Sequence, residues 1–365
     1  MTTQSKTANP KTARTCKLAA PLAIAILLAL AVAIAIAFVP AMLAAPKAFA
    51  SPSSASPSAQ SAAARQASPT SHASGDLCDY ACLAGFLDKY LAALAAHDPS
   101  QLPVAAQVKF TENTIPLKLG DALWGTFSGM GAYKIYFADP QAGQAGCEVT
   151  IRENGTPAIL VVRLKIANRK ITEVETIVRR GADPATALEK FGHPNEAWTT
   201  PLAATQRTSR AQMLNDVNLY FDGIVHLDGD MVPFDPKCNR ILDGIQDTNN
   251  PGYNEGWGHG SFNPAAMNCR DNMNTKIWAY IKSVDPRRAL IVDEKMGIVF
   301  GFFMFNHPGT VKFADVPGVG QIPMPPSAMR PFSVEVAEFF KIDANKIRQV
   351  EGVQLALPYR QPTGW

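Results

Sequence analysis

Glu112 is the first residue along the chain whose side chain could act in acid/base catalysis, given the residues around it. It lies in a short strand-like segment, and Trp124 follows it closely. A carboxylate packed against an indole ring loses contact with water, and this raises its pKa toward the range of general acid/base catalysis. The structural alternative is that Glu112 caps a helix or forms an ion pair with Arg163 or Lys165. The sequence alone leaves both roles open.

A second constellation combines an acid, a guanidinium and a phenol. Asp243 closely follows Arg240, and Tyr220 lies in a helical segment upstream that we expect to face them. Together these groups could bind a small molecule and move a proton on it. The alternative is a structural ion pair that closes the loop beginning at Asp243.

His307 and Arg288 are the remaining candidates. His307 ends the apolar run Gly-Phe-Phe-Met-Phe-Asn-His, where a histidine at the mouth of a pocket could transfer protons near neutral pH. A solvent-facing strand end is the alternative. Arg288 follows Asp285 and Arg287, and because neighbours on a strand face opposite sides, only one of the two arginines is expected to face inward.

The sequence segments that would position these residues occur twice in the chain, as an internal repeat. Leu164–Glu175 (LKIANRKITEVE) returns near the C-terminus as Phe340–Glu351 (FKIDANKIRQVE) without a gap. Each copy has two alternating runs joined by a short polar turn, which predicts a β-hairpin. Upstream of each copy, at 80–96 and 210–227, apolar residues recur at helical spacing. We therefore predict a duplicated α+β domain in which helices precede an antiparallel sheet.

The expected domain boundaries follow from these repeats. The first domain covers 76–181, a connector covers 182–207, and the second domain covers 208–365. The second domain carries two loop insertions, at 243–268 and 309–331. A length of 365 residues leaves room for about two domains.

The N-terminal segment predicts export. A basic stretch is followed by the uncharged apolar run 18–39 and by Ala48-Phe49-Ala50, which resembles a signal-peptidase site. We expect residues 1–50 to be a signal peptide and 51–75, rich in Ser, Ala and Pro, to be a disordered linker. The apolar run is also long enough to span a bilayer. The expected location is secreted or periplasmic, and the alternative is a membrane anchor with the domains outside the cytoplasm.

Charge and motifs exclude several classes of function. Five of the 34 Lys and Arg residues but none of the 31 Asp and Glu residues precede residue 51, so the formal net charge falls from +3 to about −2 without that segment. This balance gives no general basic field for nucleic acid. The sequence has no phosphate-binding Gly-rich loop, nucleophile elbow or His-Glu-x-x-His motif. We therefore expect no cofactor, metal or nucleic-acid partner.

Five cysteines follow the expected cleavage site and can pair in an oxidising compartment. Cys238 and Cys269 bracket the first insertion, and a disulfide between them would staple it. Cys78 could bond to Cys82 or reach elsewhere, and Cys147 is the expected free thiol.

The chain resembles a known family over nearly everything from Cys78 to Trp365. The similarity lies in FTENTIPLKLGDALWGT from Phe110, LVVRLKIANRKITEVE, the Cys238-x-Arg240 element, YIKSVDPRRALIVDEKMGIVFGFFMFNHPG from Tyr280, and the ending LPYRQPTGW. These segments are similar to secreted tandem proteins of fungi and bacteria, a domain family of unknown function with the nuclear transport factor 2-like (SnoaL-like) fold.

The resemblance implies a fold class but no reaction. It implies two tandem cone-shaped domains, each with helices packed on a curved antiparallel sheet around an apolar pocket. Such proteins usually read Arg-x-Glu-Asn-Gly where this chain reads Arg240-Ile241-Leu242-Asp243-Gly244, so a site built on that Glu is altered here. An Asp-Arg-Asp relay, as in epoxide hydrolases of the superfamily, is conceivable from Asp243, Arg288 and Asp285.

These patterns lead to one functional hypothesis and one alternative. The hypothesis is an exported, cofactor-independent lyase, hydrolase or isomerase that acts on a small hydrophobic or aromatic ligand by general acid/base catalysis. The alternative is a non-catalytic protein that binds the same kind of ligand. Packing of sheet faces, within the chain or in a homodimer, is a further expectation, and a membrane contact is expected only through an uncleaved N-terminal segment.

Overall fold

The computed structural model describes residues 78–365 except 255 and 257–259. The expected signal peptide, 1–50, and the linker, 51–75, lie outside these residues. Among the helices that are described, none is long and apolar enough to cross a membrane.

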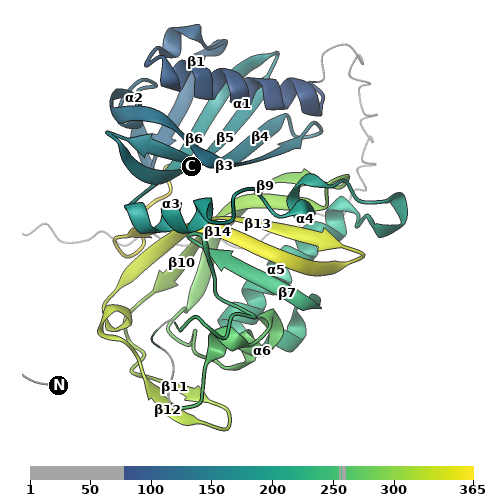
Figure 1. Cartoon of the computed structure of the whole chain (residues 1–365), viewed down its shortest axis with the longest axis vertical. Helices are drawn as coiled ribbons and strands as arrows, with labels where there is room; N and C mark the ends of the chain where they lie inside the picture. Colours follow the sequence, from purple (N-terminus) through teal and green to yellow (C-terminus); the bar gives the residue numbers. More distant parts are fainter. Residues whose placement is uncertain (1–77, 255, 257–259) are drawn as a thin grey trace, which may run out of the picture. The chain divides into compact units, whose positions relative to one another are not determined.

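The first sheet is built from the first copy of the repeat. Helix α1 (Tyr80–Ala95) begins after Asp79, whose side chain accepts a hydrogen bond from the backbone N–H of Cys82 and so caps the helix. The buried face of α1 covers one face of the sheet (Figure 1). The other elements of this part are η1 (Pro99–Gln101), β1 (Val104–Glu112), β2 (Ile115–Leu117), α2 (Leu123–Thr126), β3 (Phe127–Asp139), β4 (Gln144–Glu153), β5 (Thr156–Ala167) and β6 (Lys170–Arg180).

The connector and the second copy follow. Helix α5 (Arg210–His226) is the counterpart of α1 and is capped by Ser209. The connector contains α3 (Ala182–Glu189), α4 (Glu196–Thr199) and η2 (Ala204–Gln206). The second copy continues with η3 (Gly229–Met231), β7 (Phe234–Leu242), β8 (Ile245–Gln246), η4 (Pro264–Ala266), α6 (Cys269–Asn274), β9 (Ser283–Asp293), β10 (Ile298–His307), β11 (Phe313–Val316), β12 (Gly320–Pro323), η5 (Pro326–Met329), β13 (Phe332–Asp343) and β14 (Lys346–Leu357).

The two large sheets have the same topology. Their strand orders are β2-β1-β6-β5-β4-β3 and β8-β7-β14-β13-β10-β9. This confirms the predicted α+β class with two tandem cone-like domains. Each sheet is antiparallel except for one parallel pair, β1 with β6 and β7 with β14. A parallel pair needs a long crossover, and here the intervening strands provide it.

Both predicted hairpins are present at the expected turns. Strands β5 and β6 are joined at Asn168 and Arg169, and β13 and β14 at Ala344 and Asn345. All four of these residues have positive φ, between 49° and 60°. A two-residue type I′ turn requires positive φ at both positions because its twist matches that of the flanking strands.

A third hydrophobic core joins the two sheets, in addition to the core between each sheet and its helix. Phe137 of β3 stacks on Phe300 of β10 with ring centroids 5.0 Å apart, and it also contacts Phe339 of β13. Strand β10 is therefore buried on both faces. This explains why its sequence is continuously apolar instead of alternating.

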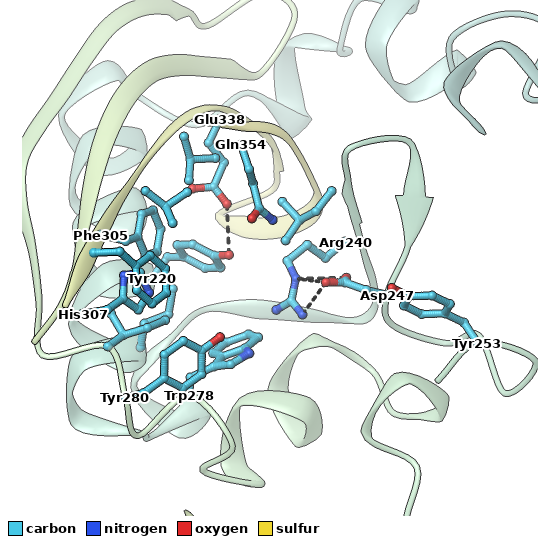
Figure 2. A pocket seen from close by; sticks show the side chains of 16 residues that line it. Tyr220, Arg240, Asp247, Tyr253, Trp278, Tyr280, Phe305, His307, Glu338 and Gln354 are labelled. Atoms are coloured by element: carbon cyan, nitrogen blue, oxygen red, sulfur yellow. Dashed lines mark hydrogen bonds and ion pairs between the residues drawn. The ribbon is translucent and has the colours of Figure 1, made fainter. Parts of the chain in front are cut away.

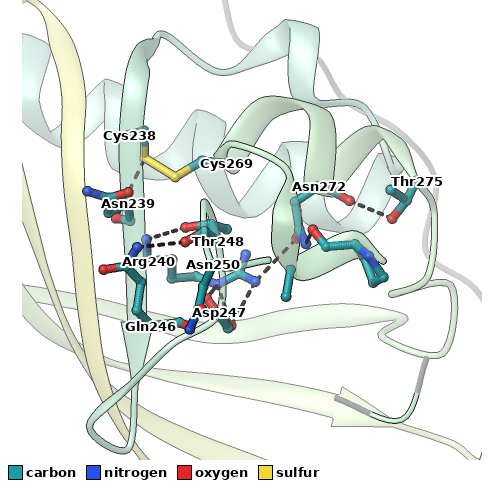
Figure 3. A network of polar contacts seen from close by, with 12 residues as sticks. Cys238, Asn239, Arg240, Gln246, Asp247, Thr248, Asn250, Cys269, Asn272 and Thr275 are labelled. Atoms are coloured by element: carbon teal, nitrogen blue, oxygen red, sulfur yellow. Dashed lines mark hydrogen bonds and ion pairs between the residues drawn. A yellow bond between two sulfur atoms is a disulfide. The ribbon is translucent and has the colours of Figure 1, made fainter. Parts of the chain in front are cut away.

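The two disulfides of the described chain are Cys78–Cys82 and Cys238–Cys269, and Cys147 is a buried free thiol. The predicted staple of the first insertion is therefore confirmed. It ties β7 to the start of α6 (Figure 3).

Removing the Cys238–Cys269 disulfide should destabilise the second domain. The bridge spans 31 residues, so replacing both cysteines by Ser is expected to lower the free energy of unfolding by about 2–4 kcal/mol in urea titrations. The Cys78–Cys82 bridge spans only 4 residues, and its double Ser variant serves as the control with a smaller expected loss. An equal or larger loss in the control would contradict this account.

Candidate functional site

The second domain contains a cavity of about 330 Å³ between α5, β7 and the concave face of its sheet (Figure 2). This volume is at the lower end of the range for small-molecule sites, roughly 300–1,000 Å³. The cavity is lined by Tyr220, Ile224, Arg240, Leu242, Asp247, Tyr253, Trp278, Tyr280, Ile281, Phe305, His307, Phe332, Val334, Val336, Glu338 and Gln354.

A carboxyl group and a phenol meet in this cavity. The Tyr220 hydroxyl, from α5, donates a hydrogen bond to Glu338 Oε1, on β13, at 3.1 Å (Figure 2). Glu338 is 1% exposed, and its Oε2 has no hydrogen-bond partner among the described residues. Burial raises the pKa of Glu338 to about 8, and nearby Asp247 adds to this, although Tyr220 and Arg240 oppose it. At neutral pH the group is therefore mostly a carboxylic acid.

Arg240 and Asp247 form a buried ion pair at another wall. Arg240 Nε and Nη2 donate to the Asp247 carboxylate at 2.8–3.0 Å, and Nη2 also donates to Asn272 Oδ1 at 3.2 Å (Figure 3). The Arg240 guanidinium lies 4.2 Å from the ring centre of Trp278. Thr248 Oγ1 accepts from the Arg240 backbone N–H at 2.7 Å. The pair is thus held rigidly and contributes no net charge to the cavity.

Breaking this ion pair should be costly. In Arg240→Met the Asp247 carboxylate stays buried without its main partner, so we expect the free energy of unfolding to fall by about 3–5 kcal/mol. Replacing both residues, as Arg240→Met with Asp247→Leu, should recover most of this loss because no buried charge remains. Urea unfolding of the four proteins of this double-mutant cycle measures the coupling. Equal losses in the single and double variants would contradict the account.

His307 lies at the end of β10 within a stack of aromatic rings. Its ring is parallel to that of Phe332 at 4.1 Å between centroids and is also stacked with Tyr280. Burial lowers the pKa of His307 to about 4, so the imidazole is neutral at physiological pH. Its Nδ1 is buried and has no hydrogen-bond partner in the described part of the chain. This geometry suits a neutral hydrogen-bonding group more than a proton carrier.

Three of the six residues predicted from the sequence line this cavity: Tyr220, Arg240 and His307. Asp243 and Arg288 point toward the first domain instead, and Glu112 belongs to that domain. Asp243, in the β7–β8 turn, accepts from the Gln354 backbone N–H at 2.9 Å and from Arg179 Nε at 3.0 Å.

The other two predicted residues also have structural partners. Arg288 forms a two-pronged ion pair with Glu175 of β6, at 2.6 and 2.9 Å, so it faces the first sheet. Glu112 accepts from the backbone N–H of Leu123, where α2 begins, and from Arg180 Nη2. Glu112 therefore makes the two contacts expected if its role is structural, namely helix capping and ion pairing.

The first domain lacks the arginine and the glutamate of the cavity. The equivalent strands have matching registers, so Phe110 occupies the position of Arg240, and Val162 that of Glu338. The interior of this domain is filled by apolar side chains, among them Trp124, which meets Tyr90 edge to face at 5.5 Å. The candidate chemistry therefore belongs to the second domain.

The sequence did not lead us to place Glu338, Asp247 or Gln354 in the cavity. A signal for Glu338 exists, because in the alternating pattern of 332–343 it shares a face with Val334, Val336 and Phe340, which are apolar. Glu335 in the same strand weakens this signal. It is a second buried acid on the opposite face.

The fold and the cavity define a tandem α+β protein of cone-like domains with a candidate site in the second domain. Comparison with family models matches residues 206–354, less than half of the chain, to a domain of unknown function (DUF8021). Comparison with curated proteins gives no match. Among solved structures, the chain is similar to BvnE pinacolase from Penicillium brevicompactum, with 14% identity, a TM-score of 0.22, and coverage of 43% of this chain and 88% of that one. A similarity this weak says nothing about the reaction of the present chain.

Proposed function

We propose that this chain is an exported, cofactor-independent enzyme that acts on a small, mostly apolar or aromatic molecule by general acid/base catalysis. Its second domain carries the site. One observation supports the proposal most: the buried Glu338 carboxyl group, held by Tyr220, lies in an aromatic cavity and has an oxygen without a hydrogen-bond partner among the described residues. A carboxyl group with a pKa near the working pH is suited to donate a proton and take it back.

Glu338 acts as the general acid in this proposal. It would donate its proton to an oxygen of the bound molecule, and Tyr220 would stabilise the carboxylate that forms. In elimination the protonated hydroxyl leaves as water, and the Glu338 carboxylate then takes the proton from the neighbouring carbon as the double bond forms. In ether or epoxide hydrolysis the proton goes to the leaving oxygen as the C–O bond breaks, and the attacking water adds its hydroxyl and gives its other proton to the Glu338 carboxylate. In isomerisation Glu338 protonates one atom of the substrate and takes a proton back from another, so each reaction class regenerates the same acid.

Export is the second part of the proposal. It is supported by the N-terminal pattern of basic, apolar and Ala-x-Ala segments and by the two disulfides, which form in oxidising compartments.

The test is incubation of the purified protein with a mixed library of aromatic ethers, epoxides, lactones and ketones. Mass spectrometry reads conversion, and crystals soaked in the same library locate the ligand. A changed mass together with ligand density beside Glu338 is the expected result. Density in the cavity without any conversion would refute catalysis and favour the alternative, a binding protein for the same ligands.

A further inference from the structure

The partners of the Glu338 carboxyl group define what a ligand must offer. Oε1 accepts a hydrogen bond from Tyr220, whereas Oε2 is buried without a partner among the residues that the structure describes. A buried polar atom without a hydrogen bond costs about 1–3 kcal/mol. A ligand that supplies the missing partner removes this cost, so the cavity favours molecules with one polar atom at this point.

The protonation of Glu338 determines whether that atom must donate or accept. A carboxylic acid has a single O–H donor. The carbonyl oxygen of a carboxylic acid is the better acceptor, so the hydrogen bond from Tyr220 to Oε1 favours the proton on Oε2 in the protonated form. Oε2 then needs an acceptor, and the carbonyl and ether oxygens of small molecules are acceptors of this kind.

The other groups that face the cavity exclude a charged ligand. Arg240 is neutralised by Asp247, and the imidazole of His307 is neutral near pH 7. An anion would lose its hydration here without gaining a counter-charge, which is costly. A cation could gain one only from Glu338 after that group loses its proton, and this costs free energy below about pH 8. Aromatic side chains, among them Tyr220, Trp278, Tyr280, Phe305 and Phe332, line the cavity, and aromatic walls favour flat molecules.

We propose that the cavity binds an uncharged, planar molecule through a carbonyl or ether oxygen that accepts a hydrogen bond from the Glu338 carboxyl group. This inference uses the site of the proposed function and adds the charge, shape and hydrogen-bonding class of its ligand. It excludes aromatic carboxylates and amines as ligands, and it ranks unsubstituted hydrocarbons lower because they leave Oε2 unpaired.

Three naphthalene probes of matched size test this inference by calorimetry at pH 6: methyl naphthyl ketone, naphthoate and naphthylmethylammonium. The ketone should bind at least about tenfold more tightly than either ion at this pH, since the anion gains no counter-charge and the cation must first remove the proton of Glu338. Its affinity should fall about tenfold between pH 6 and pH 9 as Glu338 ionises.

Two variants assign the effect to Glu338. Glu338→Gln should keep ketone binding but lose its pH dependence, because an amide N–H donates at every pH. Glu335→Gln, a matched change on the opposite face of the same strand, should behave as wild type. Tighter binding of either ion, no ketone binding, or an unchanged pH dependence in Glu338→Gln would overturn the inference.

These experiments test the ligand class of the cavity and the proposed catalysis independently. Selective ketone binding without conversion of any compound leaves the inference standing and refutes the enzyme. Conversion of an ionised compound in the cavity would refute the inference about the ligand class but would support the proposal that the protein is an enzyme.

Discussion

Replacing Glu338 by Gln is expected to lower kcat for the reaction of this protein about 10²–10⁴-fold, with little change in KM. The amide keeps the shape of the side chain and can still donate a hydrogen bond to the ligand, but it cannot transfer a proton. Steady-state kinetics on the substrate found in the library measure the change. Because the variant should bind its ligand normally, the loss would belong to the chemical step.

The matched control is Glu335→Gln. Glu335 is also a buried acid on β13, but its neighbours are Glu175 and Arg288, on the side of the first sheet. We expect this control to keep wild-type kcat. An equal loss in both variants would mean that the cavity acid has no special role, and full activity in Glu338→Gln would remove it from the mechanism.

Stability should fall as the pH rises from 6.5 to 8. Burial raises the pKa of Glu335 and of Glu338 to about 8, and that of Glu351 to about 7. Between their unfolded values near 4.5 and these folded values, the native state binds more protons than the unfolded state, so each rise in pH favours unfolding. The slope is about 1.4 kcal/mol per pH unit for each such group. His307, whose folded pKa is lowered, opposes this trend only below about pH 6.5.

Chemical unfolding at pH 6.5 and pH 8 measures this dependence. Glu335→Gln should reduce the loss by about 2 kcal/mol, because one of the groups no longer ionises on unfolding. Glu196→Gln, the same change at an exposed helix position, should leave the loss unaltered. Stability that rises between these pH values would contradict the assignment of buried, protonated acids.

Much of the fold was predictable because its signals are local. The hairpin turn at Asn168 and Arg169 and its repeat at Ala344 and Asn345 depend on residues adjacent in the sequence. The same is true of the helical spacing in α1 and α5. The parallel pairing of β1 with β6 joins distant segments, and nothing in the local pattern indicates its direction.

The site was harder to predict because both faces of the second sheet are buried. One face encloses the cavity and the other packs on the first sheet. Apolar residues therefore surround a polar residue on either face, and the sequence does not tell which of the two faces the polar residue is on. Arg288 and Asp243 therefore looked like candidates for the cavity although they bind Glu175 and Arg179 of the first sheet. Tyr220 was predictable because the helix that carries it has only one buried face.

The most direct test of this account is the titration of Glu338 itself. Carbon-13 NMR of protein labelled at the glutamate carboxyl carbon follows each group through its own pKa, and comparison with Glu338→Gln assigns the resonance. We predict that the resonance lost in the variant titrates near pH 8 in the wild-type protein. A resonance that titrates near pH 4.5, the ordinary value for glutamate, would contradict a protonated acid in the cavity and with it the proposed catalysis.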